Sequence, residues 1–141
     1  MQYNKIISYA KINISLGVIK KLKSKLHQIE SLISFIDLYD EILIKKISKK
    51  KHSIIFYGKF SKNIPKNNTI SKLLSILDNK NLLEDKKYQI FIKKNIPIKS
   101  GLGGGSMNAA SVLKYFLKKK IIKLNKKTVY KIANQVGADV A

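Results

Sequence analysis

The segment IPIKSGLGGGSMNAASVL, residues 96–113, constrains the fold more than any other part of the sequence. Four of its glycines fall within five positions, at 101 and 103–105. The residues before it, YQIFIKKN, alternate as a strand does, and the residues after it place Val112, Leu113, Phe116 and Leu117 on one helical stripe. The sequence therefore predicts a strand, a glycine-rich turn and a helix in direct succession.

The glycines admit three interpretations: a flexible linker, a plain strand-to-helix turn, or a cradle for phosphate. A linker is disfavoured because the segment joins a strand to an amphipathic helix. A cradle is chemically reasonable because glycines let backbone N–H groups approach an anion, and a helix N-terminus attracts negative charge. The P-loop and dinucleotide-binding patterns both require a glycine where the chain has Ser106, a residue that we expect to cap the helix. The turn and the cradle both remain open at this point.

The rest of the chain predicts a single mixed α/β domain over residues 1–141, without internal repeats or linkers. A turn is expected at Tyr39–Asp40. We expect strands at 6–18, 27–38, 41–47, 53–58 and 88–95, and further helices at 69–81, capped by Thr69, and at 128–136, ending before Gly137.

Composition excludes some classes of protein and leaves one alternative open. The chain has no cysteine, which excludes disulfides and cysteine-based metal or redox sites. No apolar run reaches the length that spans a membrane, and no secretory signal is evident, so we expect a cytoplasmic protein. The net charge of +21 comes from 29 lysines without any arginine. Lysine shares A/T-rich codons with the abundant Ile and Asn, so we favour a genomic bias over a basic RNA-binding protein, which stays the alternative.

Four polar residues outside the glycine segment are candidates for chemistry. Lys11 and Asn13 share one face of the first predicted strand. Asp139 follows the last predicted helix in the sequence GAD, where a carboxylate can act as a base towards a hydroxyl. His27 opens the second strand. Each also fits a plain solvent-exposed or structural role, and no His, Asp or Glu cluster has the spacing of a metal site.

Taken together and in this order, four segments resemble the GHMP small-molecule kinases. They are SYAKINISL, LHQIESLISFIDLYDEI, IPIKSGLGGGSMNAASVL and ANQVGADVA, and they extend over essentially the whole chain. Within that superfamily, the sequence looks like the branch that phosphorylates 4-diphosphocytidyl-2-C-methyl-D-erythritol in the non-mevalonate route to isoprenoids. The resemblance implies an α+β two-layer domain with the fold of ribosomal protein S5 domain 2.

The resemblance also implies roles for the candidate residues, with ATP and Mg²⁺ as cofactors. Asp139 would accept the proton of the substrate hydroxyl, and Lys11 would lower the pKa of that hydroxyl and orient Asp139. Asn13 and His27 would contact the substrate. Mg²⁺ would bridge the phosphates without a set of ligands made by the protein alone. The cradle for the ATP phosphates would consist of Pro97, Ile98, Lys99, Ser100, Gly101, Leu102, Gly103, Gly104, Gly105, Ser106 and Met107.

The sequence departs from the family pattern in its length and at single positions. Kinases of this type are roughly twice as long, so we expect the chain to hold the N-terminal, ATP-binding domain and to lack the C-terminal one, which a separate gene could encode. Tyr9, Lys25, Leu26 and Met107 stand where proline, glycine, an aromatic residue and serine are usual. Leu26 offers no ring to stack on cytosine.

Overall fold

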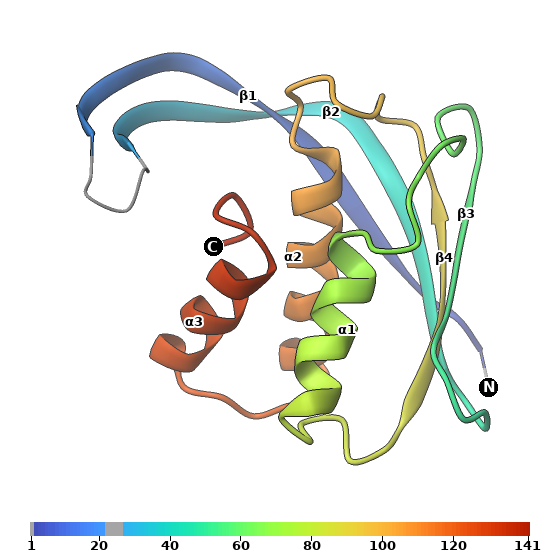
Figure 1. The fold of residues 1–141 in the computed structure, drawn as a ribbon. Helices are drawn as coiled ribbons and strands as arrows, with labels where there is room; N and C mark the ends of the chain where they lie inside the picture. The colour runs from blue at the N-terminus through green and yellow to red at the C-terminus, as the bar shows by residue number, and fades with distance from the viewer. Residues whose placement is uncertain (1, 22–26) are drawn as a thin grey trace.

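The structure is a computed structural model that describes residues 2–21 and 27–141, with side chains described for 2–15 and 32–141. Its elements in chain order are β1 (Asn4–Lys21), β2 (His27–Ile47), β3 (Ser53–Tyr57), α1 (Thr69–Asn79), β4 (Lys87–Lys93), α2 (Gly104–Lys118) and α3 (Lys126–Val136). The strands form one sheet in the order β1-β2-β4-β3, and the helices lie together on one side of it (Figure 1). This confirms the mixed α/β fold.

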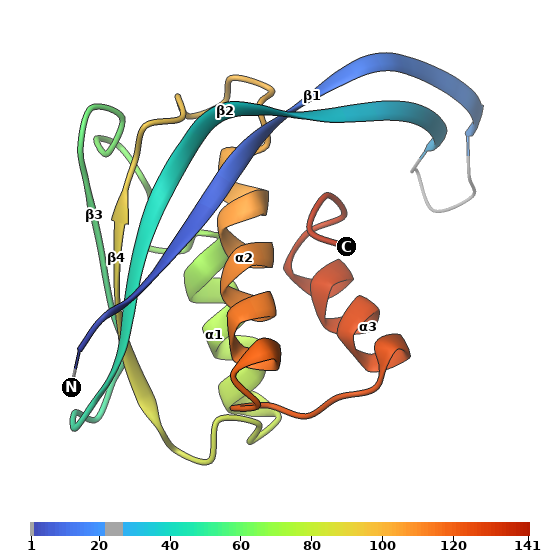
Figure 2. The same cartoon turned by 180° about the vertical axis from the view of Figure 1, so that it is seen from behind.

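The sheet owes its shape to the long pair β1 and β2. These strands are antiparallel, as are β2 and β4, whereas β3 runs parallel to β4. The far end of the β1–β2 pair extends past the helices and arches over the C-terminal residues (Figures 1 and 2). On this end of β1 the side chains of Ile12 and Ile14 are 36% and 60% exposed, so these two apolar residues point away from the core.

The hydrophobic core lies between the sheet and the three helices. Alternate residues of β2 and β4 point into it, as expected of strands with one covered face. The helices contribute residues at spacings of three and four, which places them on one stripe. The buried members include Ile42, Ile44, Tyr88, Ile90 and Ile92 from the strands, and Ile70, Leu73, Leu74, Leu77, Ala109, Val112, Leu113, Phe116, Ile132, Ala133 and Val136 from the helices. In the part of the chain that the structure describes, none of the helices is both long and apolar enough to cross a membrane.

The turn predicted at Tyr39–Asp40 is wrong. β2 runs through both residues without interruption, and Asp40 is fully buried. An aspartate favours turns when its carboxylate bonds to neighbouring backbone N–H groups. Asp40 instead accepts hydrogen bonds from the N–H groups of Asn95 and Ile96, which are distant in the sequence. Its carboxylate therefore does bond to backbone N–H groups, but to those of another segment.

The predicted helix caps are shifted at two helices. α1 is capped by Asn68, whose side chain accepts from the N–H groups of Ile70 and Ser71. The expected cap, Thr69, instead donates its hydroxyl to the carbonyl of Gly105 at 2.7 Å, which ties α1 to the glycine segment. α2 begins after Gly103 and has no side-chain cap, so the prediction that Ser106 caps it is also wrong.

His52 links the start of β3 to α1 and should make stability depend on pH. Its Nδ1 accepts from the N–H of Tyr88 at 3.0 Å, and its Nε2 lies 3.0 Å from Asp78 Oδ2. Burial lowers the pKa of His52 below its ordinary value of 6.5, and this effect outweighs the Asp78 carboxylate, which raises it. The unfolded chain therefore binds the proton more readily than the folded one.

We expect the free energy of unfolding to be highest above pH 6.5 and to decrease as the pH falls below that value. The contribution of one proton limits this slope to about 1.4 kcal/mol per pH unit. Urea denaturation at a series of pH values measures it. His52→Gln keeps a polar side chain that does not titrate, so the slope between pH 6.5 and 5 should become shallower in this variant. An unchanged slope would show that other groups cause it.

Candidate active site

The glycine segment leaves β4 and enters α2 through a tight bend. Gly101 and Gly103 have φ angles of +78° and +70°, in the left-handed region that side chains other than glycine rarely adopt. The N–H of Met107 makes a helical bond to the carbonyl of Gly103 at 2.8 Å. The N–H groups of residues 104–106 precede that bond and therefore have no partner within α2. An uncapped helix start of this kind can receive an anion.

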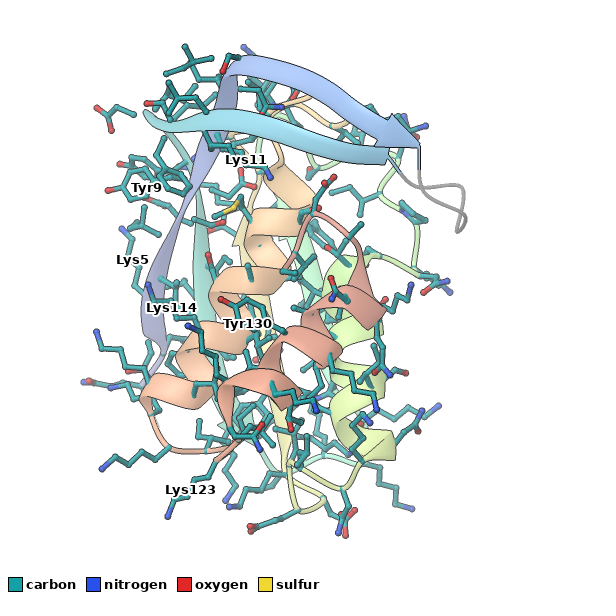
Figure 3. All side chains as sticks on the ribbon, turned by 90° about the vertical axis from the view of Figure 1, so that its left-hand side faces the viewer. Lys5, Tyr9, Lys11, Lys114, Lys123 and Tyr130 are labelled. Atoms are coloured by element: carbon teal, nitrogen blue, oxygen red, sulfur yellow. The ribbon has the colours of Figure 1, made fainter. Side chains whose placement is uncertain are left out.

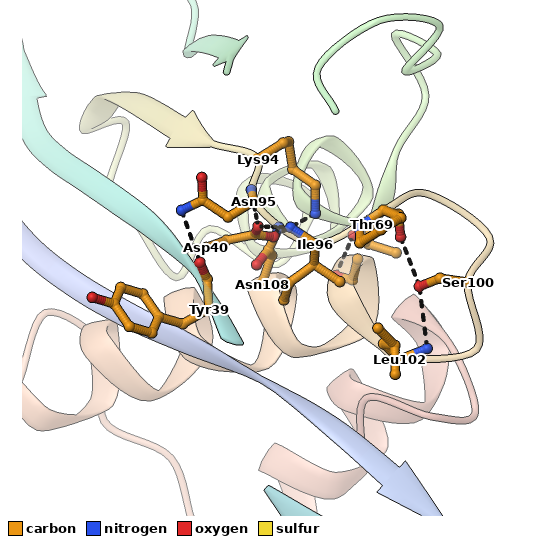
Figure 4. A network of polar contacts seen from close by, with 11 residues as sticks. Tyr39, Asp40, Thr69, Lys94, Asn95, Ile96, Ser100, Leu102 and Asn108 are labelled. Carbon is orange, nitrogen blue, oxygen red and sulfur yellow. Dashed lines mark hydrogen bonds and ion pairs between the residues drawn. The ribbon is translucent and has the colours of Figure 1, made fainter. Parts of the chain in front are cut away.

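Three hydrogen bonds hold the bend in place. The N–H of Lys11 in β1 donates to the carbonyl of Leu102 at 3.0 Å. Within the segment, the Ser100 hydroxyl donates to the carbonyl of Pro97 at 2.8 Å (Figure 4). From α1, the Thr69 hydroxyl donates a hydrogen bond to the carbonyl of Gly105. The segment is therefore fixed from both sides and is not a flexible linker.

The bend forms one wall of an open cleft of about 460 Å³. Its other walls come from β1, from the loop before α1 and from the C-terminal residues. Four of its lining residues carry charge: Lys11, Lys94, Lys99 and Asp139. Lys94 is already ion-paired with the buried Asp40, which leaves the lysines at 11 and 99 and the carboxylate at 139. This set suits an anionic ligand whose reaction needs a base. Figure 3 shows Lys11 beneath the arched end of the β1–β2 pair, where it points towards the start of α2.

The cleft gathers most of the residues that the sequence singled out. Lys11, Asn13 and Asp139, distant in the chain, all line it, and Asp139 is exposed to solvent within it. From the glycine segment, the cleft is lined by Pro97, Ile98, Lys99, Ser100, Gly101, Gly103, Gly104, Gly105 and Ser106.

Two predicted residues lie elsewhere, and one lies outside the described side chains. Leu102 does not line the cleft: its carbonyl accepts from the N–H of Lys11, and its own N–H donates to the Ser100 hydroxyl at 3.4 Å. Met107 lines a separate hollow between β1 and α2. His27 begins β2, but its side chain lies outside the described residues, as do the neighbouring Lys25 and Leu26.

Lys11 packs directly against the glycine segment. A Cβ atom added to Gly103 would lie 2.8 Å from Lys11 Cε and 3.0 Å from Lys11 Cγ. Real Cβ atoms do not approach other atoms so closely, so glycine is the residue that lets the Lys11 side chain pass here. The segment therefore also sets the path of the lysine side chain into the cleft.

Sequence reasoning missed three buried polar residues: Lys94 and Asn108, which line the cleft, and Asp40, which lies behind it. Asp40 has the sequence context of a turn, and Lys94 is one of 29 lysines. Asn108 falls in a stretch that reads as a helix. One sequence signal could have identified Lys94. The alternation of β4, continued one residue past its end, places Lys94 on the same face as the core residues Ile90 and Ile92.

The residues present fit ATP better than a protein-bound metal. Among the described residues, no group of three or more His, Cys, Asp or Glu could hold a metal ion. The cleft offers backbone N–H groups at an uncapped helix start together with lysine side chains. These are donors for phosphate oxygens, and a divalent cation bound at this site would take most of its ligands from the phosphates themselves.

A family model and several relatives match the chain. The model described as "GHMP kinases N terminal domain" matches residues 68–141. A 4-diphosphocytidyl-2-C-methyl-D-erythritol kinase of Pelagibacter ubique is 62% identical over 136 residues, which are 96% of this chain and 48% of that protein. The corresponding kinase of Thermotoga maritima is 36% identical over 135 residues, 96% of this chain and 47% of that protein. The chain thus spans about half the length of these curated relatives.

Solved structures show the same fold. The crystal structure of a 4-(cytidine 5'-diphospho)-2C-methyl-D-erythritol kinase superposes with a TM-score of 0.74 at 24% identity, covering 97% of this chain and 47% of that one. Homoserine kinase from Cytophaga hutchinsonii superposes with a TM-score of 0.66 at 18% identity, covering 96% of this chain and 41% of that one. The RNA-binding alternative gains no support from these comparisons. With the fold, the glycine segment and the family model in agreement, this chain belongs to the GHMP kinases and carries their N-terminal domain.

Proposed function

We propose that the chain takes part in the ATP-dependent phosphorylation of a hydroxyl group of 4-diphosphocytidyl-2-C-methyl-D-erythritol. The observation that carries the proposal is the single cleft that holds an uncapped, glycine-lined helix start, a lysine and a carboxylate. The substrate is inferred from the Pelagibacter ubique relative, which is named as a kinase of this compound and is 62% identical over nearly the whole chain. A cytoplasmic location is part of the same proposal.

In this proposal each residue of the cleft has a separate role in phosphoryl transfer. The N–H groups at the start of α2 and the glycine segment hold the ATP phosphates, and bound Mg²⁺ neutralises part of their charge. Asp139 accepts the proton of the substrate hydroxyl. The ammonium group of Lys11 stabilises the developing alkoxide and orients Asp139. Asn13 and His27 contact the substrate.

Positioning is the main contribution that this chain can make. Phosphoryl transfer depends mainly on in-line positioning of the two reactants and on neutralisation of the phosphate charge. It does not require a covalent intermediate with the protein. The three hydrogen bonds around the bend fix the phosphate site before any ligand binds. The relatives are about twice as long, so we propose that a further domain, in the same protein or separately encoded, closes the cleft and excludes water from it.

The proposal is tested by two measurements on the chain, with and without a second half built from the sequence of the Pelagibacter ubique relative. Calorimetry measures binding of MgATP, and a coupled assay measures ADP formation with the diphosphocytidyl substrate. We expect MgATP binding in both samples, and substrate-dependent ADP formation that rises when the second half is added. Absence of MgATP binding at millimolar concentration in both samples would contradict the proposal.

A further inference from the structure

A buried carboxylate lies directly behind the glycine segment. Asp40, in the middle of β2, is 0% exposed. A charge in such a position is costly unless several donors surround it. All four donors to Asp40 come from two short stretches of chain, and these stretches flank the glycine segment (Figure 4).

The stretch before the glycines supplies three of the donors. Asp40 Oδ1 accepts from the N–H of Asn95 at 2.8 Å and from the N–H of Ile96 at 2.9 Å. Asp40 Oδ2 forms an ion pair with the ammonium group of Lys94, which is itself only 4% exposed. The chain therefore turns away from β4 around this carboxylate.

The stretch after the glycines supplies the fourth donor. Asn108, in the second turn of α2, donates its Nδ2 to Asp40 Oδ2 at 3.0 Å. Its Oδ1 is buried and has no hydrogen-bond partner among the described residues, so the bond from Nδ2 to Asp40 sets the orientation of the amide. If the amide were flipped, Asn108 Oδ1 would face Asp40 Oδ2, and the two oxygens would repel each other.

The first residue of α2 rests on the same cluster. A Cβ atom added to Gly104 would lie 3.0 Å from Ile96 Cγ2 and 3.2 Å from Lys94 Nζ. Ile96 and Lys94 thus occupy the space that a side chain at position 104 would fill, so residues 94–96 pack against the backbone at the start of α2, where the cleft offers its N–H groups. The position of the phosphate site is thus coupled to the cluster around Asp40.

From this geometry we propose that Asp40 is a positioning residue, which fastens both ends of the glycine segment to β2 and so fixes the shape of the phosphate site. One carboxylate closes residues 97–107 into a loop of defined span. Lys94 is held at the wall of the cleft by the same contact. The role in ligand binding rests on the proposed function of the cleft, whereas the closure of the loop does not.

The first test is Asp40→Asn, which keeps the size of the side chain but places an NH₂ group among the donors. The matched control is Asp37→Asn, the same change at an exposed position of the same strand. Hydrogen exchange is followed at the N–H of Ile96, since the side chain of Asn95 has its own bond to the carbonyl of Tyr39. We expect exchange to accelerate about tenfold or more at Ile96, because its hydrogen bond to a charged group is weakened, and also to accelerate at Met107, whose N–H donates to the carbonyl of Gly103. Exchange at Ile90 and Ile92 in β4 should change much less.

The same variants are then tested for MgATP binding and for melting temperature. The Asp40→Asn chain should bind MgATP about tenfold more weakly than the Asp37→Asn chain. If the parent chain itself does not bind MgATP, the proposed function fails, and hydrogen exchange still decides whether Asp40 closes the loop. Uniform acceleration across the sheet and the glycine segment would show that Asp40 only supports packing, and unchanged exchange at Ile96 would also overturn the proposal.

A second variant guards against failure of Asp40→Asn to fold, because that change leaves the Lys94 cation buried without a carboxylate. Asn108→Leu removes only the bond from α2, and its side chain has a similar volume without a buried polar atom. We expect this chain to fold and to show faster exchange at Met107, whose N–H donates to the carbonyl of Gly103, with exchange at Ile96 nearly unchanged. A parental exchange rate at Met107 would overturn the two-ended arrangement.

Discussion

Asp139→Asn is expected to lower the rate of phosphoryl transfer by about a hundredfold to ten-thousandfold, the usual contribution of a general base. The amide has the shape of the carboxylate but cannot accept the hydroxyl proton. Asp139 is exposed within the cleft and lies beyond α3, so its replacement should leave the melting temperature unchanged. MgATP binding should also be retained, because the proposed phosphate site is built from the start of α2.

The measurement compares single-turnover rates at saturating MgATP, in whichever sample of the chain shows substrate-dependent ADP formation. Asp37→Asn again serves as the control, because it removes one exposed carboxylate that does not line the cleft. A parental rate in Asp139→Asn would show that Asp139 is not the base. Loss of MgATP binding together with the rate would assign Asp139 to the nucleotide site instead.

Gly103→Ala is expected to reduce turnover by about tenfold to a hundredfold through displacement of a neighbouring side chain. The new methyl group would lie 2.8 Å from Lys11 Cε. The lysine side chain is flexible and gives way more easily than the backbone, so the ammonium group should move out of position while the fold persists. The loss should therefore appear in the rate of transfer more than in stability.

Gly101→Ala is a matched control for this prediction. Gly101 and Gly103 have nearly the same left-handed φ, +78° and +70°, so alanine costs about 1 kcal/mol of backbone strain at either position. A Cβ atom on Gly101 meets nothing within 4 Å. Equal losses of turnover in the two variants would attribute the effect to backbone strain and would contradict the displacement of Lys11.

The sequence predicted the parts of the fold that depend on local pattern. Alternation located the strands, and the stripe that begins at Val112 located α2, because one face of each element is covered by the core. The glycines located the bend, since two of them adopt backbone angles that other residues avoid. Lys11 and Asp139 could be connected only through the family resemblance, because no local pattern brings the two ends of a chain together.

The parts that sequence reasoning missed depend on contacts between distant segments. Asp40 has the sequence context of a turn, and only the approach of residues 94–96 gives it partners inside the fold. Ser106 has the chemistry of a helix cap, yet α2 begins with glycines and leaves its first N–H groups to the cleft. In both cases a polar residue departs from its local preference next to the candidate active site.

The arrangement of the cleft also bears on how the protein is made. Lys11 lies in the first strand and Asp139 beyond the last helix, and both line one cleft. During synthesis, β1, β2 and the glycine segment leave the ribosome well before Asp139 does. On the proposed function, a nascent chain can therefore assemble the phosphate cradle while the proposed base is still inside the ribosomal tunnel, and phosphoryl transfer has to wait at least until Asp139 has emerged.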